Sequence, residues 1–438
     1  MNLLQLSWRN LIHHPLASSL SLILFALGIG LVSLLFLLQS QLQNNFEKNL
    51  ASVDLVVGAK GSPLQLILSS MYHIDAPTGN VSLGEARPFL NPKHPLIEKA
   101  IPLSLGDSYQ GYRIVGTDQN ILGLYGAEIG AGKTWEYHFE AVIGATVAAD
   151  PNLKLTLGST FKGGHGLVKD VDLEHTEAEA FEVVGILKPT GTVIDQLILT
   201  TTQSFWLVHA HEEHEATSEE EQAIDSTETL SHHDSHDHEE HDHKVTPKPL
   251  LEEEDENEIT ALLLKFKSKM SFQSLNMLRG INENTDLQAA SPAIEINRLF
   301  DLMSSGEEAL RILAFVIVFV SGLSIFISLF SSLRERKYEL ALMRVMGASR
   351  TTLLMLIVLE GLLLAFVGYL IGIALSHGGM QLIAGFMQDK YRYSFTGLTF
   401  LKEEVWLFAG ALLIGLIAAI LPAVQAARTD ISDTLVQQ

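Results

Sequence analysis

Four long stretches with almost no charge constrain this chain more than any other feature of its sequence. Residues 15–46, 312–333 and 405–427 contain no Asp, Glu, Lys or Arg, and residues 351–375 contain only Glu360. At 1.5 Å rise per residue, a helix of 22 residues reaches about 33 Å, which spans a hydrocarbon core of about 30 Å. We therefore predict four transmembrane helices.

Positive charge in short loops predicts the orientation of these spans. Residues 334–350 hold five Lys or Arg and two Glu, whereas the longer segment 376–404 holds three Lys or Arg. The first segment is therefore predicted to be cytoplasmic, together with both termini. Polar residues without a small-residue cleavage pattern follow the first span, so we interpret it as a retained anchor and not as a signal peptide.

The predicted fold class is an α-helical integral membrane protein with four transmembrane helices and a large external α+β domain on helical stalks. Patterns such as YRIVGTD and FEVVGILKPTGT are typical of short strands ended by Gly, Pro or Asp. QLQNNFEKNL and EINRLFDLM predict helical connections to the spans. The predicted boundaries are 1–14 for an N-terminal cytoplasmic amphipathic helix, 15–40 for the first span, 41–306 for the external domain with a disordered insert at 209–258, 307–333 for the second span, 334–350 for a cytoplasmic helix, 351–376 for the third span, 377–404 for an external loop, 405–424 for the fourth span and 425–438 for a cytoplasmic tail.

The insert at 209–258 carries most of the negative charge of the protein. It holds 19 Asp or Glu and two Lys, or −17 of the formal net charge of −22, in a chain whose mean hydropathy is +0.23. The rest of the chain is therefore nearly neutral, and it lacks the basic footprint of a nucleic-acid-binding protein. The few apolar residues of the insert predict that it does not fold by itself.

Nine of the 17 histidines lie in this insert, between His209 and His243. Imidazoles among carboxylates suit Zn²⁺, and also Ni²⁺ or Cu²⁺, and the absence of cysteine excludes thiolate ligands. Three interpretations stay open: a solvated acidic linker, weak zinc buffering or sensing, and one defined site that combines His165 or His175 with His209 or His211. The candidate zinc ligands are His165, His175, His209, His211, His214, His232, His233, His236, His238, His241 and His243, and each of them singly could also be a surface or hydrogen-bonded histidine.

Residues 127–134, AEIGAGKT, satisfy a relaxed phosphate-loop pattern. However, Ala127 replaces the first glycine, and the following TWEYHFEAVIG alternates like a strand instead of opening a helix. We interpret the stretch as a turn between strands. Because the sequence also lacks a credible nucleophile–base set or paired carboxylates, we predict a non-catalytic protein.

The cytoplasmic segment 334–350 is predicted to form an amphipathic helix, with Tyr338, Leu342, Val345 and Met346 at helical spacing and Gly347 at its end. Such a helix either docks in the groove of a partner protein and transmits force, or lies passively at the membrane surface.

The same region carries a family resemblance. LRERKYELALMRVMGASRTTLLMLIVLEGLLLAFVGYLIGIAL resembles the signature of FtsX-like ABC transporter permeases of the MacB or lipoprotein-release type, also called type VII. SWRNLIHHPLASSLSLILFALGIG and LPAVQAARTDISDTL resemble the two ends of these permeases, and AVIGATVAADPNLKLTLGSTF with FEVVGILKPTGTVIDQLIL resembles their periplasmic core. The insert is a departure from the family and leaves the cargo open.

The resemblance implies a non-catalytic permease subunit in the bacterial inner membrane, with the external domain in the periplasm. It implies homo- or heterodimers that bind two copies of a cytoplasmic ATPase, and this ATPase, not the permease, holds ATP and Mg²⁺. The work would then be mechanical, on an envelope lipoprotein, a lipid or a partner protein; the alternative is zinc transport or zinc sensing through the insert. By matching position, the residues expected to contact the ATPase through this coupling helix are Arg336, Tyr338, Glu339, Leu342, Arg344, Met346 and Gly347.

Glu360 is expected to have a partner within the bundle, because a carboxylate in a span is costly without one. Either it is a packed, hydrogen-bonded group near the cytoplasmic boundary, or it belongs to a proton or ion relay.

Overall fold

The computed structural model divides the chain into two compact units. One consists of Met1–Asn44 and Leu302–Gln438, and the other of Asn45–Asp301. The residues that the structure describes are 3–13, 15–50, 52–74, 76–165, 179–209, 245–268, 272–391 and 395–428.

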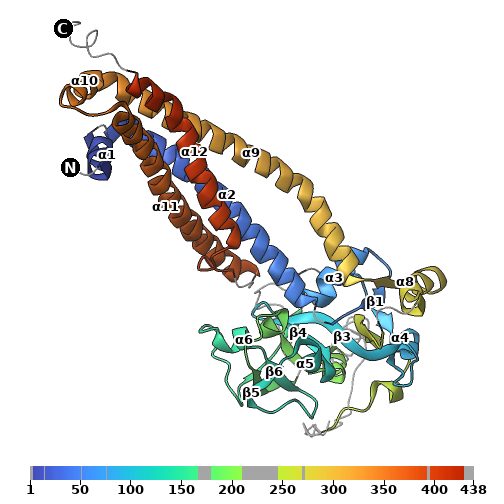
Figure 1. Cartoon of the computed structure of the whole chain (residues 1–438). Coiled ribbons are helices and arrows are strands. Elements are labelled where there is room, and N and C mark those ends of the chain that lie inside the picture. Colours follow the sequence, from blue (N-terminus) through green and yellow to red (C-terminus); the bar gives the residue numbers. More distant parts are fainter. Residues whose placement is uncertain are drawn as a thin grey trace, which may run out of the picture. The chain divides into compact units, whose positions relative to one another are not determined.

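The first unit is helical (Figure 1). Its helices are α1 (Leu3–His13), α2 (Pro15–Asn49), α9 (Pro292–Glu335), α10 (Lys337–Val345), α11 (Arg350–Tyr391) and α12 (Lys402–Ala427). Four of them, α2, α9, α11 and α12, are long and apolar enough to cross a membrane, which confirms the predicted set of spans. Because α2 ends at Asn49 and α9 begins at Pro292, both connections to the second unit are helical.

The predicted end of the third span differs from the structure. An external loop is predicted at 377–404, but α11 continues to Tyr391, roughly four turns further. The predicted end follows the end of the apolar run at Leu375, whereas the helix continues beyond it through residues of mixed polarity.

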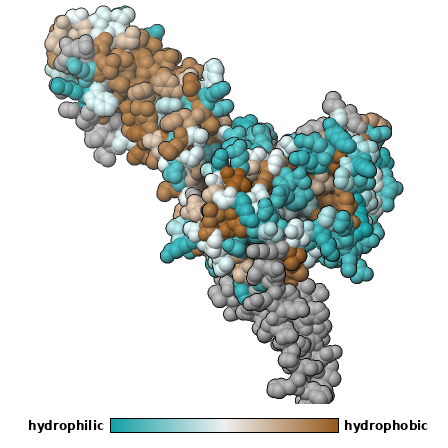
Figure 2. Space-filling model, turned by 90° about the horizontal axis from the view of Figure 1, so that it is seen from below, coloured by the Kyte–Doolittle hydropathy of each residue, from teal (hydrophilic) through white to brown (hydrophobic). Residues whose placement is uncertain are grey.

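Small residues let the long helices pack closely. A Cβ atom added at Gly30 of α2 would lie 2.9 Å from the Gly372 carbonyl oxygen of α11, and one added at Gly361 would lie 2.6 Å from Ala419 Cβ of α12. Glycine at such contacts is typical of membrane helices, which gain stability from close van der Waals packing. The outward surface is apolar, with exposed residues such as Phe315, and Figure 2 shows brown, apolar residues over most of this helical part on the face it presents.

The second unit is a mixed α+β domain. Among the described residues its main sheet has the order β13-β1-β12-β3-β4-β10-β6-β9-β5, with β7 on β9 and β8 on β3, while β11 and β2 form a separate pair. The strands are β1 (Leu55–Ala59), β2 (Val81–Ser82), β3 (Ile97–Tyr109), β4 (Tyr112–Thr117), β5 (Ile129–Gly132), β6 (Glu140–Ile143), β7 (Thr160–Phe161), β8 (Gly164–His165), β9 (Phe181–Leu187), β10 (Ile198–Thr201), β11 (Glu258–Ile259), β12 (Ala261–Phe266) and β13 (Leu287–Ala290).

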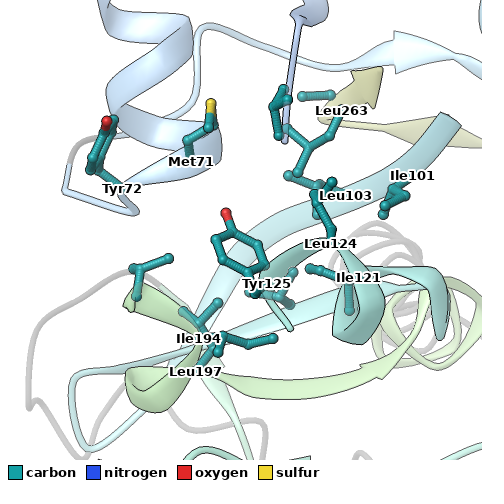
Figure 3. Close-up of a cluster of buried hydrophobic side chains, with 14 of the residues drawn as sticks. Met71, Tyr72, Ile101, Leu103, Ile121, Leu124, Tyr125, Ile194, Leu197 and Leu263 are labelled. Atoms are coloured by element: carbon teal, nitrogen blue, oxygen red, sulfur yellow. The ribbon is translucent and has the colours of Figure 1, made fainter. Parts of the chain in front are cut away.

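Helices cover this sheet. They are α3 (Pro63–Met71), α4 (Leu83–Leu90), α5 (Asn120–Tyr125), α6 (Ala145–Ala149), α8 (Phe272–Asn284) and the 3₁₀ turns η2 (Val193–Gln196) and η3 (Leu250–Glu252), with a further helical stretch at 202–209. The largest core lies between α3, α5, η2 and strands such as β3 and β12, as Figure 3 shows for Met71, Leu124, Ile194 and Leu263. The patterns YRIVGTD and FEVVGILKPTGT form β4 and β9 as predicted, and β9 buries every second side chain from Phe181 to Leu187.

The phosphate-loop-like stretch forms a strand and not the predicted turn. Residues Ile129–Gly132 are β5, paired antiparallel with β9. Lys133 Nζ lies 3.0 Å from Glu140 Oε1 and 3.4 Å from Glu136 Oε2, and its hydrogen bond with Glu140 raises the pKa of the lysine. With its ammonium held by carboxylates and no helix after it, this stretch does not have the arrangement of a phosphate-binding loop.

Candidate functional site

The short helix α10 has two contrasting faces. Leu340 and Ala341 are buried, and Leu340 belongs to an apolar cluster with Leu353 of α11 and Ala423 of α12. On the other face Tyr338 is 48% exposed, Leu342 43% and Met346, just after the helix, 73%. This helix is therefore fixed to the bundle by one side, and it presents an apolar stripe on the other.

The end of α10 is shaped by glycine. Gly347 has φ +101°, a conformation that favours glycine, and its N–H donates to the Arg344 carbonyl at 3.0 Å. The Ser349 hydroxyl then accepts a hydrogen bond from the Thr352 N–H at 3.2 Å in the first turn of α11. Short, capped connections of this kind keep α10 at a defined angle to the span that follows it.

Arg336 lies at the start of α10 but does not belong to the exposed stripe. Its Nη1 is 3.1 Å from Glu360 Oε1, and its Nε is 3.1 Å from Glu339 Oε2. Glu360 is 2% exposed and also accepts a hydrogen bond of 2.7 Å from Asn10 Nδ2 of α1. Arg336 was predicted to contact the ATPase; the structure directs this side chain into the bundle instead.

The remaining predicted contact residues are accessible to different degrees. The side chain of Glu339 is 66% exposed, and that of Arg344 is half-buried. The buried Arg336–Glu360 pair is the packed and hydrogen-bonded arrangement that was one of the two interpretations of Glu360. It joins three elements, α1, the α9–α10 junction and α11.

A second buried polar cluster was missed by the sequence reasoning. Glu404, 4% exposed in the first turn of α12, accepts a hydrogen bond of 3.2 Å from the Ser33 hydroxyl of α2 and lies 3.0 Å from His377 Nε2 of α11. The hydroxyls of Ser33 and Ser376 are 2.9 Å apart. Glu404 also closes a capping contact, since its Oε2 accepts from the Leu401 N–H at 3.3 Å.

This cluster connects α2, α11 and α12, and the ring of His377 is held on its other side by the Gly397 carbonyl. His377 and Glu404 lie one residue outside the predicted spans 351–376 and 405–424, so neither counts as a charge within a span. A histidine at the end of one predicted span and a glutamate at the start of the next could have indicated this cluster from the sequence.

In the second unit, aromatic side chains hold the ends of both connecting helices. The rings of Phe46 of α2 and Phe300 of α9 are 5.6 Å apart, and the Tyr72 ring lies 4.9 Å from Phe46. The Tyr72 hydroxyl donates to the Phe46 carbonyl at 3.0 Å, and Ile296 of α9 is buried in the same core. Asn49, the last residue of α2, accepts a hydrogen bond of 2.6 Å from the Val193 N–H.

Most of the predicted zinc ligands lie outside the described residues. These are His175, His211, His214, His232, His233, His236, His238, His241 and His243, and for His165 only the backbone, in β8, is described. His209 is described, and its Nε2 lies 3.2 Å from Asp107 Oδ2. Among the side chains that the structure describes, no three of His, Cys, Asp and Glu gather as a metal site.

Two family models match the chain. The FtsX-like permease C-terminal model matches residues 311–431, which include α10, α11 and α12. The MacB-like periplasmic core domain model matches residues 18–226. The chain belongs to the FtsX/MacB-type permeases. It is therefore a membrane subunit of the ABC-transporter type, from a generally non-catalytic family with a periplasmic domain, and this family implies a separate ABC ATPase as partner.

No curated protein sequence matches this permease. Among solved structures, one similar chain is the periplasmic region of MacB from Actinobacillus actinomycetemcomitans, with 9% identity and a TM-score of 0.32. The match covers 59% of this chain and 96% of that one. The family assignment rests on the two family models.

Proposed function

We propose that this permease couples ATP hydrolysis by a separate cytoplasmic ATPase to conformational work of its periplasmic domain at the bacterial inner membrane. The observation that carries the proposal is the two-faced helix α10. Its buried face packs against α11 and α12. The stripe formed by Tyr338, Leu342 and Met346 stays exposed, as far as the structure describes the chain. A short apolar helix fixed from behind suits a groove on a partner.

In this proposal α10 is the coupling helix. Tyr338, Leu342 and Met346 fill the groove of the ATPase, and Glu339 and Arg344 contribute at its polar rim. Gly347 contributes by its positive φ, which sets the angle between α10 and α11. ATP and Mg²⁺ belong to the ATPase, and the permease acts as a homo- or heterodimer with two ATPase copies.

The buried ion pair supports a route for the movement. Because Arg336 is bound to Glu360, a displacement of α10 pulls on α11 through a contact with little side-chain freedom. In the periplasmic domain, Phe46, Tyr72 and Phe300 attach the ends of α2 and α9 to the domain core. Movement of these helices therefore moves the core with them, and the work is done on an envelope lipoprotein, a lipid or a partner protein.

The test is to place charge in the stripe. Leu342→Arg together with Met346→Arg leaves the buried face of α10 intact but makes the groove contact unfavourable. We expect the ATPase that co-purifies from native membranes to be lost from the complex, and its activity in the complex to fall at least tenfold. Leu157→Arg, at an exposed leucine of the periplasmic domain, is the matched control and should keep both. ATP hydrolysis that remains coupled to the permease in the double variant would refute the docking assignment.

A second candidate function is zinc transport or zinc sensing. It is favoured by the contact between His209, the first residue of the histidine-rich stretch, and the buried carboxylate of Asp107. This function predicts that replacing the histidines of 211–243 impairs zinc handling by the cell while the ATPase stays bound.

A further inference from the structure

The ring of His377 in α11 lies between two oxygen atoms, and both of its nitrogen atoms are engaged. Nδ1 faces the Gly397 carbonyl oxygen, and Nε2 lies 3.0 Å from Glu404 Oε1. A carbonyl oxygen only accepts hydrogen bonds, so Nδ1 carries a hydrogen and donates it. In a neutral imidazole Nε2 would then present a lone pair to the carboxylate. The arrangement is therefore satisfied only when the pair holds one further proton, on His377 Nε2 or on Glu404 Oε1.

The connection between α11 and α12 is attached to both neighbouring helices beside this pair. Gln41 of α2 exchanges two hydrogen bonds with the backbone of Thr396, at 2.6 and 2.9 Å. The Gly397 N–H donates to Gln381 Oε1 of α11 at 3.0 Å, and a Cβ atom added at Gly397 would overlap the His377 carbonyl oxygen. The Gly397 carbonyl therefore keeps its direction towards the imidazole and cannot turn away from it.

The titratable groups beside the pair do not neutralise it. The Tyr369 hydroxyl donates to the backbone carbonyl of Glu404 and not to its carboxylate, at 3.1 Å. From α2, the neutral hydroxyl of Ser33 donates to Glu404 Oε1 at 3.2 Å. Lys402 and Glu403, in the same turn of α12 as Glu404, are exposed to solvent. Among the residues that the structure describes, the cation that meets this carboxylate is therefore the imidazolium.

An aromatic ring favours positive charge on the imidazole. The Phe400 ring lies with its centroid 4.6 Å from that of His377, within the range of a cation–π contact. The position of Glu404 in the first turn of α12 favours its negative charge, because the N-terminal end of a helix is the positive end of its dipole. Both neighbours stabilise the form in which His377 carries the proton.

We propose that His377 and Glu404 bind one proton towards the periplasmic end of α2, and that this proton joins α2, α11, α12 and the α11–α12 connection. When the proton leaves for solvent, the Nε2 lone pair faces the carboxylate at 3.0 Å. Relief of this repulsion requires the imidazole to rotate, which also breaks its hydrogen bond with Gly397. A rise in periplasmic pH therefore loosens the link. The inference goes beyond the proposed function and does not depend on docking of the ATPase.

The sign of the pH dependence follows from the number of bound protons. In an unfolded chain above about pH 6.5, histidine is mostly neutral and glutamate is ionised, so these two groups hold no proton. The folded arrangement holds one, and its stability therefore falls as the pH rises above that value. One proton corresponds to a change of up to about tenfold in the unfolding equilibrium constant per pH unit.

Glu404→Gln imitates the proton-bound pair. With its amide nitrogen towards His377, the glutamine donates one hydrogen to Nε2 and the other to the Ser33 hydroxyl, and its oxygen accepts from the Leu401 N–H. The hydrogen-bonding groups of the pair are then satisfied without a bound proton. Glu403→Gln makes the same chemical change at the exposed neighbour and is the matched control.

A spin label on the α11–α12 connection reports on the link in the full-length protein in lipid nanodiscs. Leu398 is 82% exposed, and the chain contains no cysteine, so Leu398→Cys carries a single label. In this background and with Glu403→Gln, the label should be ordered at about pH 6 and more mobile at about pH 9. It should stay ordered at both values with Glu404→Gln, and be mobile at both with His377→Asn.

Unfolding of the same proteins provides the second measurement. The unfolding equilibrium constant with Glu403→Gln should rise relative to that with Glu404→Gln by up to about tenfold per pH unit above about pH 6.5. The proposal is overturned if the label in Glu404→Gln follows the pH as it does in Glu403→Gln, or if the label in Glu403→Gln does not respond to pH. Binding of the ATPase to the same proteins is scored separately, so that this proposal and the docking of α10 can each fail alone.

Discussion

The buried pair of Arg336 and Glu360 makes a sharp prediction about the stability of the membrane unit. With Nη1 and Oε1 3.1 Å apart, the attraction is about 5 kcal/mol at an effective dielectric constant of about 20. Both side chains are more than 90% buried. Without Glu360, Arg336 keeps the exposed Glu339 as its partner, and without Arg336, Glu360 keeps the neutral amide of Asn10, so either single change leaves a buried charge with weaker compensation. We therefore expect Glu360→Met or Arg336→Met alone to lower the free energy of unfolding by about 3–5 kcal/mol.

The double variant should behave differently from the sum of the two. Two methionines remove both desolvation costs and fill similar volume, so Arg336→Met with Glu360→Met is expected to recover most of the loss, within about 1–2 kcal/mol of the natural protein. A smaller loss of stability should remain in the double variant, because Asn10 no longer has Glu360 as its hydrogen-bond acceptor.

The assay is reversible unfolding in mixed micelles with increasing denaturing detergent. Trp8 of α1 and Trp406 of α12 both lie in this unit and provide the fluorescence. Losses that are additive in the double variant, or single losses below about 1 kcal/mol, would refute the inference that each buried charge depends on the other for its compensation. Leu4→Met, at an exposed position of α1, is a control with no expected effect.

Two further predictions concern other buried polar groups. Ser33→Ala removes one of the hydrogen bonds to Glu404 and should lower the free energy of unfolding by about 1–3 kcal/mol in the same assay. Ser40→Ala, two turns further along α2 at an exposed contact with Asn44, is the control and should be neutral. Equal effects of the two changes would contradict a stabilising role of the buried cluster. In the periplasmic domain, burial and then the charge of Arg113 lower the pKa of His73 to about 3, so its contribution to stability is complete above pH 6.5 and is lost as the pH falls from 6.5 towards 3. His73→Gln, which cannot be protonated, should flatten the fall of the thermal midpoint over that range, and an unchanged pH profile would contradict the assignment.

The features that could be predicted from the sequence are those that depend on neighbouring residues. Uncharged runs of 22 or more residues have few stable alternatives to membrane helices, and the two faces of α10 follow from helical spacing around Leu342. Strand patterns were predictable where Gly or Pro ended them, as in β9. The AEIGAGKT stretch failed because β5 pairs with β9 across more than 50 residues, and such a partner outweighs local turn chemistry.

Tertiary contacts between distant residues could not be predicted in the same way. Ser33 and Glu404 are 371 positions apart, and Arg336 turns inward only because Glu360 of α11 lies beside it. Helical spacing places Arg336 next to the exposed stripe and gives no indication of a buried partner. The contact between Asp107 and His209 likewise forms only when the fold brings β3 and the helix at 202–209 together.

The two polar clusters of the membrane unit both include α11, and their spacing bears on what this helix can do. Glu360 and Ser376 are 16 residues apart, which is about 24 Å along the helix. Residues 361–368 of α11 are all apolar or glycine, Leu364 and Ala365 among them are buried, and Gly372 lies against Gly30 of α2. The Tyr369 hydroxyl, further along, donates to the Glu404 carbonyl at 3.1 Å. Along α11 a chain of polar side chains is therefore interrupted between Glu360 and Tyr369, whereas a close-packed helix bound at both ends transmits displacement along its axis. If α11 acts in this way, enlarging Gly372 to leucine should separate α11 from α2 and reduce work in the periplasm while the ATPase remains bound to α10. Loss of the ATPase itself in that variant would show that the two ends of α11 are not linked in this order.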